Sequence, residues 1–257
     1  MPAQEIPVFW KRKRVTDENF VIDTHFKVLH EDADILILDK PSPLAVHPVG
    51  VYAELNLHTL LKNDARWAGQ SLRFVHRLDA ETSGVICAAK TEAAARFLGI
   101  EFMNGRVDKN YHALVFGVLE KSEGEINARL GHDESSGFQT VRIADEVNGE
   151  EACTRYKVLW SAGGYSWLEI TPLTGRTHQI RVHLALLGHP IAGDKIYVDL
   201  DLFREYVTGG LSENILNRLK LPRLALHASR LSFTHPGTRE RVEFLCPAPD
   251  FLKDVRP

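Results

Sequence analysis

The sequence predicts an α+β fold built on a mixed, mainly antiparallel central β-sheet with flanking helices and loops. Strand-like segments dominate, helix-like segments intervene irregularly, and hairpin signals such as Asn148-Gly149 are frequent. The 257 residues are enough to bury a full core, and they contain no internal repeat or linker that would divide it. We therefore expect an N-terminal arm over 1–27 and a single domain over 28–257.

Apolar runs and the residues that end them predict the elements of the first half. Short apolar runs predict strands at 35–38, 85–89 and 109–117. Three prolines between residues 41 and 48 force an extended loop after the first strand. Helices are predicted within 55–68 and over 92–104, the second with Thr91 as its N-cap and Gly105 after its end.

The second half is predicted to contain more strands, with one helix of particular interest. A hairpin is expected from 141 to 159, turning at Asn148-Gly149. Thr177 can cap a helix that carries apolar residues at helical spacing and ends before Gly188. Residues 199–220 are expected to form a loop and a short helix. Further strands are predicted at 167–170, 224–233 and 241–245.

Composition and charge restrict the class of protein. The net charge is −3 and the pI about 6.5, so a polyanion would have to bind a local basic patch. The three cysteines are scattered without metal-ligand spacing, which favours reduced thiols in a cytoplasmic protein. The sequence shows neither a signal peptide nor a membrane span, and we expect a monomer. A basic run over 11–14 is either a solvated arm or a polyanion contact.

Three polar stretches within these apolar segments are candidates for chemistry: residues 75–84, Tyr111, and residues 174–183. In the first, Asp79 follows the basic pair His76-Arg77 and is expected on a loop at the mouth of the sheet. A lone aspartate there could equally accept backbone N–H groups in a turn. Tyr111 could be a core aromatic residue and Arg181 a surface arginine, so each residue taken singly leaves both interpretations open.

The twelve histidines raise the alternative of a metal site, which their spacing does not support. His178 and His183 are five residues apart, so they do not share a helix face, and no glutamate stands between them as in metalloproteases. A mixed site that includes His76 and Asp79 has no further spacing signal. Ser83 lacks the flanking glycines of a nucleophile elbow. We expect no metal.

Taken together, the polar stretches resemble the RluA-like pseudouridine synthases, enzymes that convert uridine in RNA to its carbon-linked isomer. The likeness extends from about residue 35 to the C-terminus. Its motifs are Ile37-Leu38-Asp39-Lys40-Pro41, Val75-His76-Arg77-Leu78-Asp79, the strand containing Lys109 and Tyr111, Thr174-Gly175-Arg176-Thr177-His178-Gln179-Ile180-Arg181-Val182-His183, and Gly193-Asp194-Lys195.

This resemblance implies a catalytic cleft across the sheet, an RNA substrate (rRNA or tRNA), no cofactor and no separate N-terminal RNA-binding domain. It implies that Asp79 is the catalytic aspartate, Tyr111 the active-site tyrosine, and Arg181 the partner of the aspartate, for which its fixed fork is well suited. The residues expected to bind substrate are His76, Arg77, Arg176, His178 and Lys195. The alternatives are a catalytically inactive RNA-binding module on the same fold and a metal-dependent phosphoesterase built from the histidines.

Overall fold

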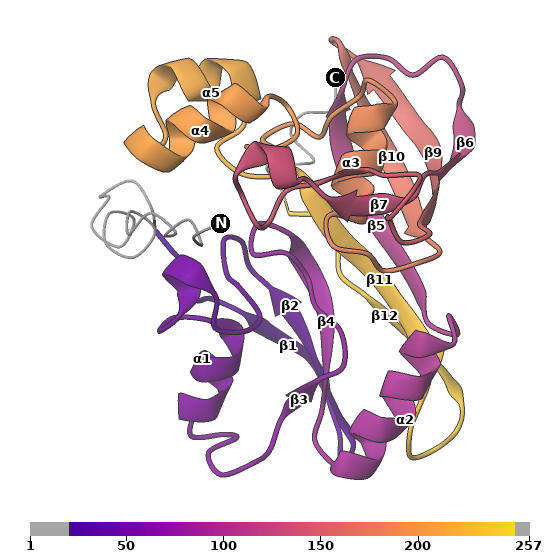
Figure 1. Ribbon diagram of the computed structural model, residues 1–257. Coiled ribbons are helices and arrows are strands. Elements are labelled where there is room, and N and C mark those ends of the chain that lie inside the picture. Colours follow the sequence, from indigo (N-terminus) through magenta and orange to yellow (C-terminus); the bar gives the residue numbers. More distant parts are fainter. Residues whose placement is uncertain (1–20, 250–257) are drawn as a thin grey trace.

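A computed structural model describes residues 21–249. It contains a ten-stranded sheet in which strands that are distant in the sequence are neighbours (Figure 1). The main strand order is β1-β2-β4-β11-β5-β10-β9-β6, with β12 paired to β11 and β3 to β4. The β4–β11 pair is parallel and the other pairs are antiparallel. The predicted α+β fold with a mixed, mainly antiparallel sheet is confirmed. The basic run over 11–14 lies outside the described residues.

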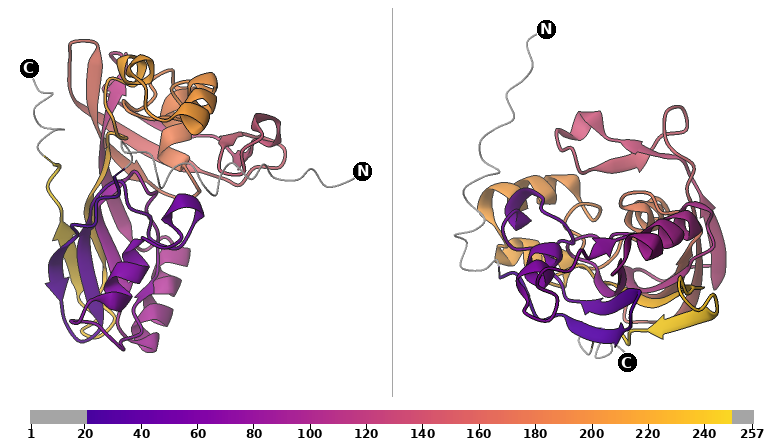
Figure 2. Two further views of the ribbon diagram at one scale, coloured as in Figure 1. Left: turned by 90° about the vertical axis from the view of Figure 1, so that its left-hand side faces the viewer. Right: turned by 90° about the horizontal axis from the view of Figure 1, so that it is seen from below.

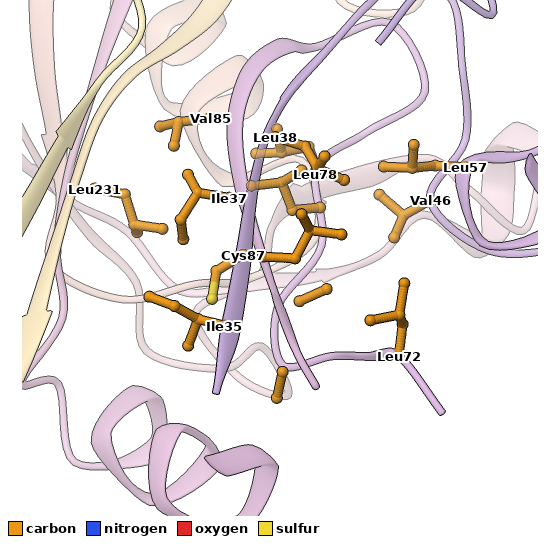
Figure 3. Packing of buried hydrophobic residues seen from close by; sticks show 14 of the residues in the cluster. Ile35, Ile37, Leu38, Val46, Leu57, Leu72, Leu78, Val85, Cys87 and Leu231 are labelled. Carbon is orange, nitrogen blue, oxygen red and sulfur yellow. The ribbon is translucent and has the colours of Figure 1, made fainter. Parts of the chain in front are cut away.

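One half of the sheet contains β1 (Lys27–Glu31), β2 (Ile35–Lys40), β3 (Arg73–Phe74) and β4 (Ser83–Ala89). Helices α1 (Leu57–Asn63) and α2 (Glu92–Met103) pack against this half. All seven residues of β4 are buried, and its side chains pack with those of β2 in the first core cluster (Figure 3). Each large aliphatic side chain buried there contributes roughly 1.5–3 kcal/mol. This core fixes the strand that begins directly after the Asp79 loop.

The other half contains β5 (Asp108–Phe116), β6 (Glu123–Asn127), β9 (Cys153–Ala162), β10 (Tyr165–Pro172) and α3 (Gln179–Leu186). Strands β11 (Leu226–Thr234) and β12 (Arg241–Leu245) follow at the end of the chain. Helix α3 packs against the sheet through Ile180 and Leu184, which belong to the second core cluster. Tyr111 contacts both clusters, so it lies where the two halves of the sheet meet.

Two smaller units are attached to this sheet. Strands β7 (Leu130–His132) and β8 (Arg142–Ala144) form a separate two-stranded sheet, which projects from the body (Figure 2). Helices α4 (Leu200–Gly209) and α5 (Glu213–Leu219) pack on residues 138 and 141 in a third cluster. The expected loop and short helix over 199–220 are therefore two helices. No helix among residues 21–249 has the length and apolar character needed to cross a membrane.

The predicted hairpin at Asn148-Gly149 is wrong. Strand β8 pairs with β7, whereas β9 pairs with β10 and β6. The Gly149 N–H donates to the Asp145 carbonyl, and the Asp145 carboxylate accepts from two N–H groups of the same turn. The dipeptide does form a turn, but the strands on either side of it have other partners.

The predicted helix starts are correct for one helix and wrong for another. The Thr91 hydroxyl accepts from the Ala94 N–H and caps α2 as expected, and Gly105 follows with φ +66°. Helix α3 ends before Gly188, as expected, but its N-cap is His178 and not Thr177. The hydroxyl of Thr174 binds the Gln179 side chain, which in turn accepts from the Arg176 N–H. The side chain of Gln179, the first residue of α3, thus binds the residues that precede the helix and fixes its start.

Candidate active site

A pocket of about 560 Å³ opens between the two halves of the sheet. It is lined by the loop over 75–82, the end of α2, β5 and the loop that leads into α3. Seven of the eight site residues predicted from the sequence line it: His76, Arg77, Asp79, Tyr111, Arg176, His178 and Arg181. The eighth, Lys195, is not part of the lining and contacts the loop through Glu81. Segments separated by about one hundred residues in the chain therefore share one cavity.

The Asp79 loop is held by its backbone, which leaves the carboxylate directed into the pocket. The Asp79 carbonyl accepts from the Thr82 N–H, and the buried side chain of Leu78 packs in the first core cluster. After the loop, Gly84 has φ +112°, and a Cβ there would lie 2.2 Å from the Ala228 carbonyl oxygen. Only glycine permits this approach, which brings β4 into parallel register with β11.

Lys40 supports the same loop from within the core. Its side chain is fully buried, and its ammonium donates to the carbonyls of Pro41 (2.9 Å), Leu44 (2.7 Å) and Ala80 (3.3 Å). Burial lowers the pKa of Lys40 to about 7. Three carbonyl acceptors match the three protons of the charged form, and one of them belongs to the residue after Asp79.

Arg181 connects Asp79 to a second aspartate that was not predicted as a site residue. Its Nη1 donates to Asp79 Oδ2 at 3.2 Å, so the expected contact is present. Its Nε and Nη2 both donate to Asp194, each at 2.8 Å. The two-bond pairing that we expected with Asp79 is therefore made with Asp194. Asp194 is fully buried and also accepts the N–H groups of Ile196 and Tyr197.

This arrangement keeps Asp79 ionised. Burial raises the pKa of Asp79, but the neighbouring His178 and Arg181 outweigh it and the pKa lies below its ordinary value. The pKa of His178 is itself lowered to about 4, mainly by burial, so this ring is neutral near pH 7. Arg181 is then the permanent cation that offsets the burial of the carboxylate, and the Asp79 side chain retains 20% exposure toward the pocket.

His178 has an uncommon backbone conformation at this site. It lies in the left-handed region with φ 56°, which is strained for a residue other than glycine. Its Nδ1 forms a hydrogen bond of 2.8 Å with the Tyr197 hydroxyl, whose oxygen also accepts the Arg142 N–H. Its Nε2 lies 3.8 Å from Asp79 Oδ2, a separation beyond hydrogen-bonding distance.

Tyr111 forms the floor of the pocket on β5. Burial and the nearby Asp79 carboxylate both raise the pKa of its phenol. The hydroxyl therefore keeps its proton in the resting site, and the ring offers an aromatic face to a planar ligand.

Three of the predicted substrate-binding residues have structural partners. His76 stacks on Phe102, and its Nε2 accepts the Cys87 N–H. Burial lowers the pKa of His76 to about 3, so the ring that lines the pocket is uncharged near pH 7. Arg176 pairs with Glu150 at 2.6 Å at the rim. Lys195 does not reach the cavity surface and pairs with Glu81 at 2.7 Å, which ties the Asp79 loop to the segment that holds Asp194.

Sequence reasoning assigned no role to Asp194, Tyr197 and Lys109, although Asp194 and Lys109 stand within the motifs named above. Asp194 follows Gly193, whose φ is +77° and whose Cβ would lie 1.9 Å from the Arg223 carbonyl oxygen. A charged residue after a glycine in an otherwise apolar segment was a usable signal for a buried carboxylate. For Tyr197 the residue type alone gave no signal, because an aromatic residue is ordinary in sequence, whereas Lys109 stands in the same motif as Tyr111.

One group among the described residues has suitable spacing for a metal ion. Side-chain atoms of Asp32, Asp34 and His235 lie within 4.8 Å of one another. His235 Nδ1 accepts the N–H groups of Gly237 and Thr238, so Nε2 carries the proton and donates to Asp32. Both ring nitrogens thus have hydrogen-bond partners, and none of the three residues lines the pocket. The three cysteines are free.

Comparison with known proteins gives a consistent result. Residues 34–186 match the family model described as RNA pseudouridylate synthase. Ribosomal large subunit pseudouridine synthase C of Escherichia coli O157:H7 is 39% identical over 232 residues, which are 88% of this chain and 67% of that protein. An uncharacterized RNA pseudouridine synthase of Synechocystis is 33% identical over 240 residues, which are 91% of this chain and 68% of that protein.

Solved structures of human proteins share the fold. Human RNA Pseudouridylate Synthase Domain Containing 1 superposes with a TM-score of 0.70 at 28% identity, covering 90% of this chain and 86% of that one. Human RNA Pseudouridylate Synthase Domain Containing 4 gives 0.69 at 27% identity, covering 88% and 90%.

Proposed function

The chain belongs to the RluA-like family of RNA pseudouridine synthases, and we propose that it isomerises uridines of large-subunit ribosomal RNA with Asp79 as its catalytic residue. It is an RNA pseudouridine synthase, an isomerase acting on RNA. Relatives that are 35%, 39% and 38% identical to it over the aligned residues are named for the large ribosomal subunit, which favours that RNA over tRNA. We further propose that residues 28–257 act as one catalytic unit.

The observation that carries the assignment is the partly buried carboxylate of Asp79, 3.2 Å from Arg181 and open to the pocket. Isomerisation breaks the bond between the sugar C1′ and N1 of uracil, turns the base, and joins C1′ to C5. The hydrogen on C5 leaves as a proton and N1 gains one, so no oxidant or cofactor is consumed. An ionised acid can attack the nucleoside or assist departure of the base, and the low pKa of Asp79 keeps that form available.

The target uridine must leave its stack to reach this pocket, which costs a few kcal/mol and is least for a loop nucleotide. In our proposal the uracil stacks on Tyr111 and the sugar faces Asp79. Arg77, an exposed residue at the pocket edge, occupies the space that the base has left or holds its phosphate. The phenol of Tyr111 holds its proton at rest, so it can accept the C5 proton only while passing its own to a neighbour such as Asp79.

A tritium-release assay tests the proposal, because the hydrogen on C5 is lost in the reaction. The substrate is unmodified large-subunit rRNA transcribed with uridine tritiated at C5. Wild-type enzyme should release tritium, and Asp79→Asn should release none above background while binding the transcript with similar affinity. Asp201→Asn, at an exposed position on α4, is the matched control and should keep the wild-type rate. Substantial turnover by Asp79→Asn would end the assignment.

A further inference from the structure

The cations around the pocket differ in whether a carboxylate neutralises them. Arg181 is paired with two aspartates, Arg176 with Glu150, and Lys195 with Glu81. Lys109 also lines the pocket, yet within residues 21–249 its ammonium forms no ion pair. Its single acceptor there is the Thr174 carbonyl, at 3.2 Å. An ammonium has three protons, so two remain available for a ligand.

Among residues 21–249, no carboxylate lies within ion-pairing distance of the Lys109 ammonium. Nζ lies beside Gly175, where a Cβ would be 3.7 Å away, and His76 on the other side is neutral. The adjacent Asp108 binds Arg241 instead. Burial lowers the pKa of Lys109, and no carboxylate counteracts this. A partly buried cation in a cavity without a counter-ion is stabilised when an anion binds there.

The position of Lys109 relative to Tyr111 suggests which anion this is. The two residues are separated by two positions on β5, so they face the same side of the sheet, about 6.6 Å apart along the strand. With the uracil on Tyr111 and the sugar at Asp79, a phosphate attached to that sugar can extend toward Lys109. We propose that Lys109 binds a backbone phosphate next to the flipped uridine and so holds the nucleotide in register. This inference rests on the proposed function of the same pocket.

The experiment measures how binding depends on salt, because a phosphate contact releases counterions and a purely structural lysine does not. Lys109→Gln removes the charge but keeps an N–H donor for the Thr174 carbonyl. Affinity for the unmodified large-subunit rRNA transcript is measured by filter binding between 50 and 400 mM salt. Loss of one phosphate contact should reduce the slope of log K against log salt by about 0.7, which is roughly fivefold in affinity at 0.1 M.

Matched variants separate charge from packing. Lys109→Arg should keep the wild-type slope, and Lys109→Met should lose as much slope as Lys109→Gln. Lys157→Gln is the control: Lys157 is exposed on β9, and Thr154 of that strand faces α3, so by alternation Lys157 lies on the opposite sheet face. It should leave the slope unchanged. Thermal unfolding of each variant shows whether it is folded.

Kinetics should show the same contact. Tritium release by Lys109→Gln should have a KM about five times higher, with kcat changed by less than about threefold. An unchanged salt slope, or a lower kcat with wild-type KM, would overturn the phosphate contact and place Lys109 at the base or in the framework. Absence of tritium release by the wild-type enzyme would instead refute the proposed rRNA substrate, so the two failures are distinguishable.

Discussion

Replacing Asp194 with asparagine should disable the enzyme without removing any group that touches the substrate. In the wild-type protein Asp194 holds Nε and Nη2 of Arg181, which leaves Nη1 for Asp79. The cluster contains two carboxylates and one guanidinium, with Asp194 fully buried and the Arg181 side chain 8% exposed. Asparagine has a similar shape but no charge, so the Arg181 guanidinium would rotate and donate two hydrogen bonds to Asp79. Both oxygens of the Asp79 carboxylate would then be occupied.

The expected loss of stability in Asp194→Asn follows from the burial of the Asp194–Arg181 ion pair. Removing one partner of a buried ion pair costs about 3–5 kcal/mol of unfolding free energy. For a protein of this size that corresponds to a Tm lower by roughly 6–20 °C. Asp201→Asn also removes an aspartate paired with an arginine, but its side chain is 86% exposed, so the change should be within about 1 kcal/mol.

The assay combines unfolding by denaturant with tritium release at a temperature where the variant is folded. The free energy difference between wild type and Asp194→Asn should also depend on pH. The pKa of Asp194 is lowered in the folded protein from its usual 3.8, so its contribution is present above that value and is lost as pH falls below it. A variant with wild-type Tm and wild-type kcat would refute the reasoning that Asp194 positions Arg181.

Two further predictions concern the chemistry. Tyr111→Phe should bind the rRNA transcript with near wild-type affinity, because the ring is kept, but kcat should fall by at least about tenfold if the hydroxyl takes part in proton transfer; an unaffected rate would remove that role. Activity should fall below about pH 4 and be constant from about pH 5 to 6, because Asp79 has a lowered pKa, His178 a pKa of about 4, and Lys40, which supports the Asp79 loop, keeps its charge below its pKa of about 7. An acid limb with a midpoint near 6.5 would contradict this and point to a titrating histidine.

The sequence by itself was sufficient for the fold class, the family and seven of the residues that meet in the pocket. These depend on local properties: apolar periodicity for β5, a hydroxyl at Thr91 for the start of α2, and short polar motifs around Asp79 and Arg181. Each of these signals lies within a few residues of the element that it describes.

The tertiary structure decided which distant groups became partners. The Asn148-Gly149 dipeptide specified a turn, but β9 pairs with β10 and β6 because those strands bury its apolar side chains. In the same way Nε and Nη2 of Arg181 donate to Asp194 and not to Asp79. The close approach of Gly193 to the Arg223 backbone holds the segment that carries Asp194. Within residues 21–249 Lys109 has no carboxylate partner, because the adjacent Asp108 pairs with Arg241 instead. Pairings of this kind depend on distances between segments, which local sequence patterns do not encode.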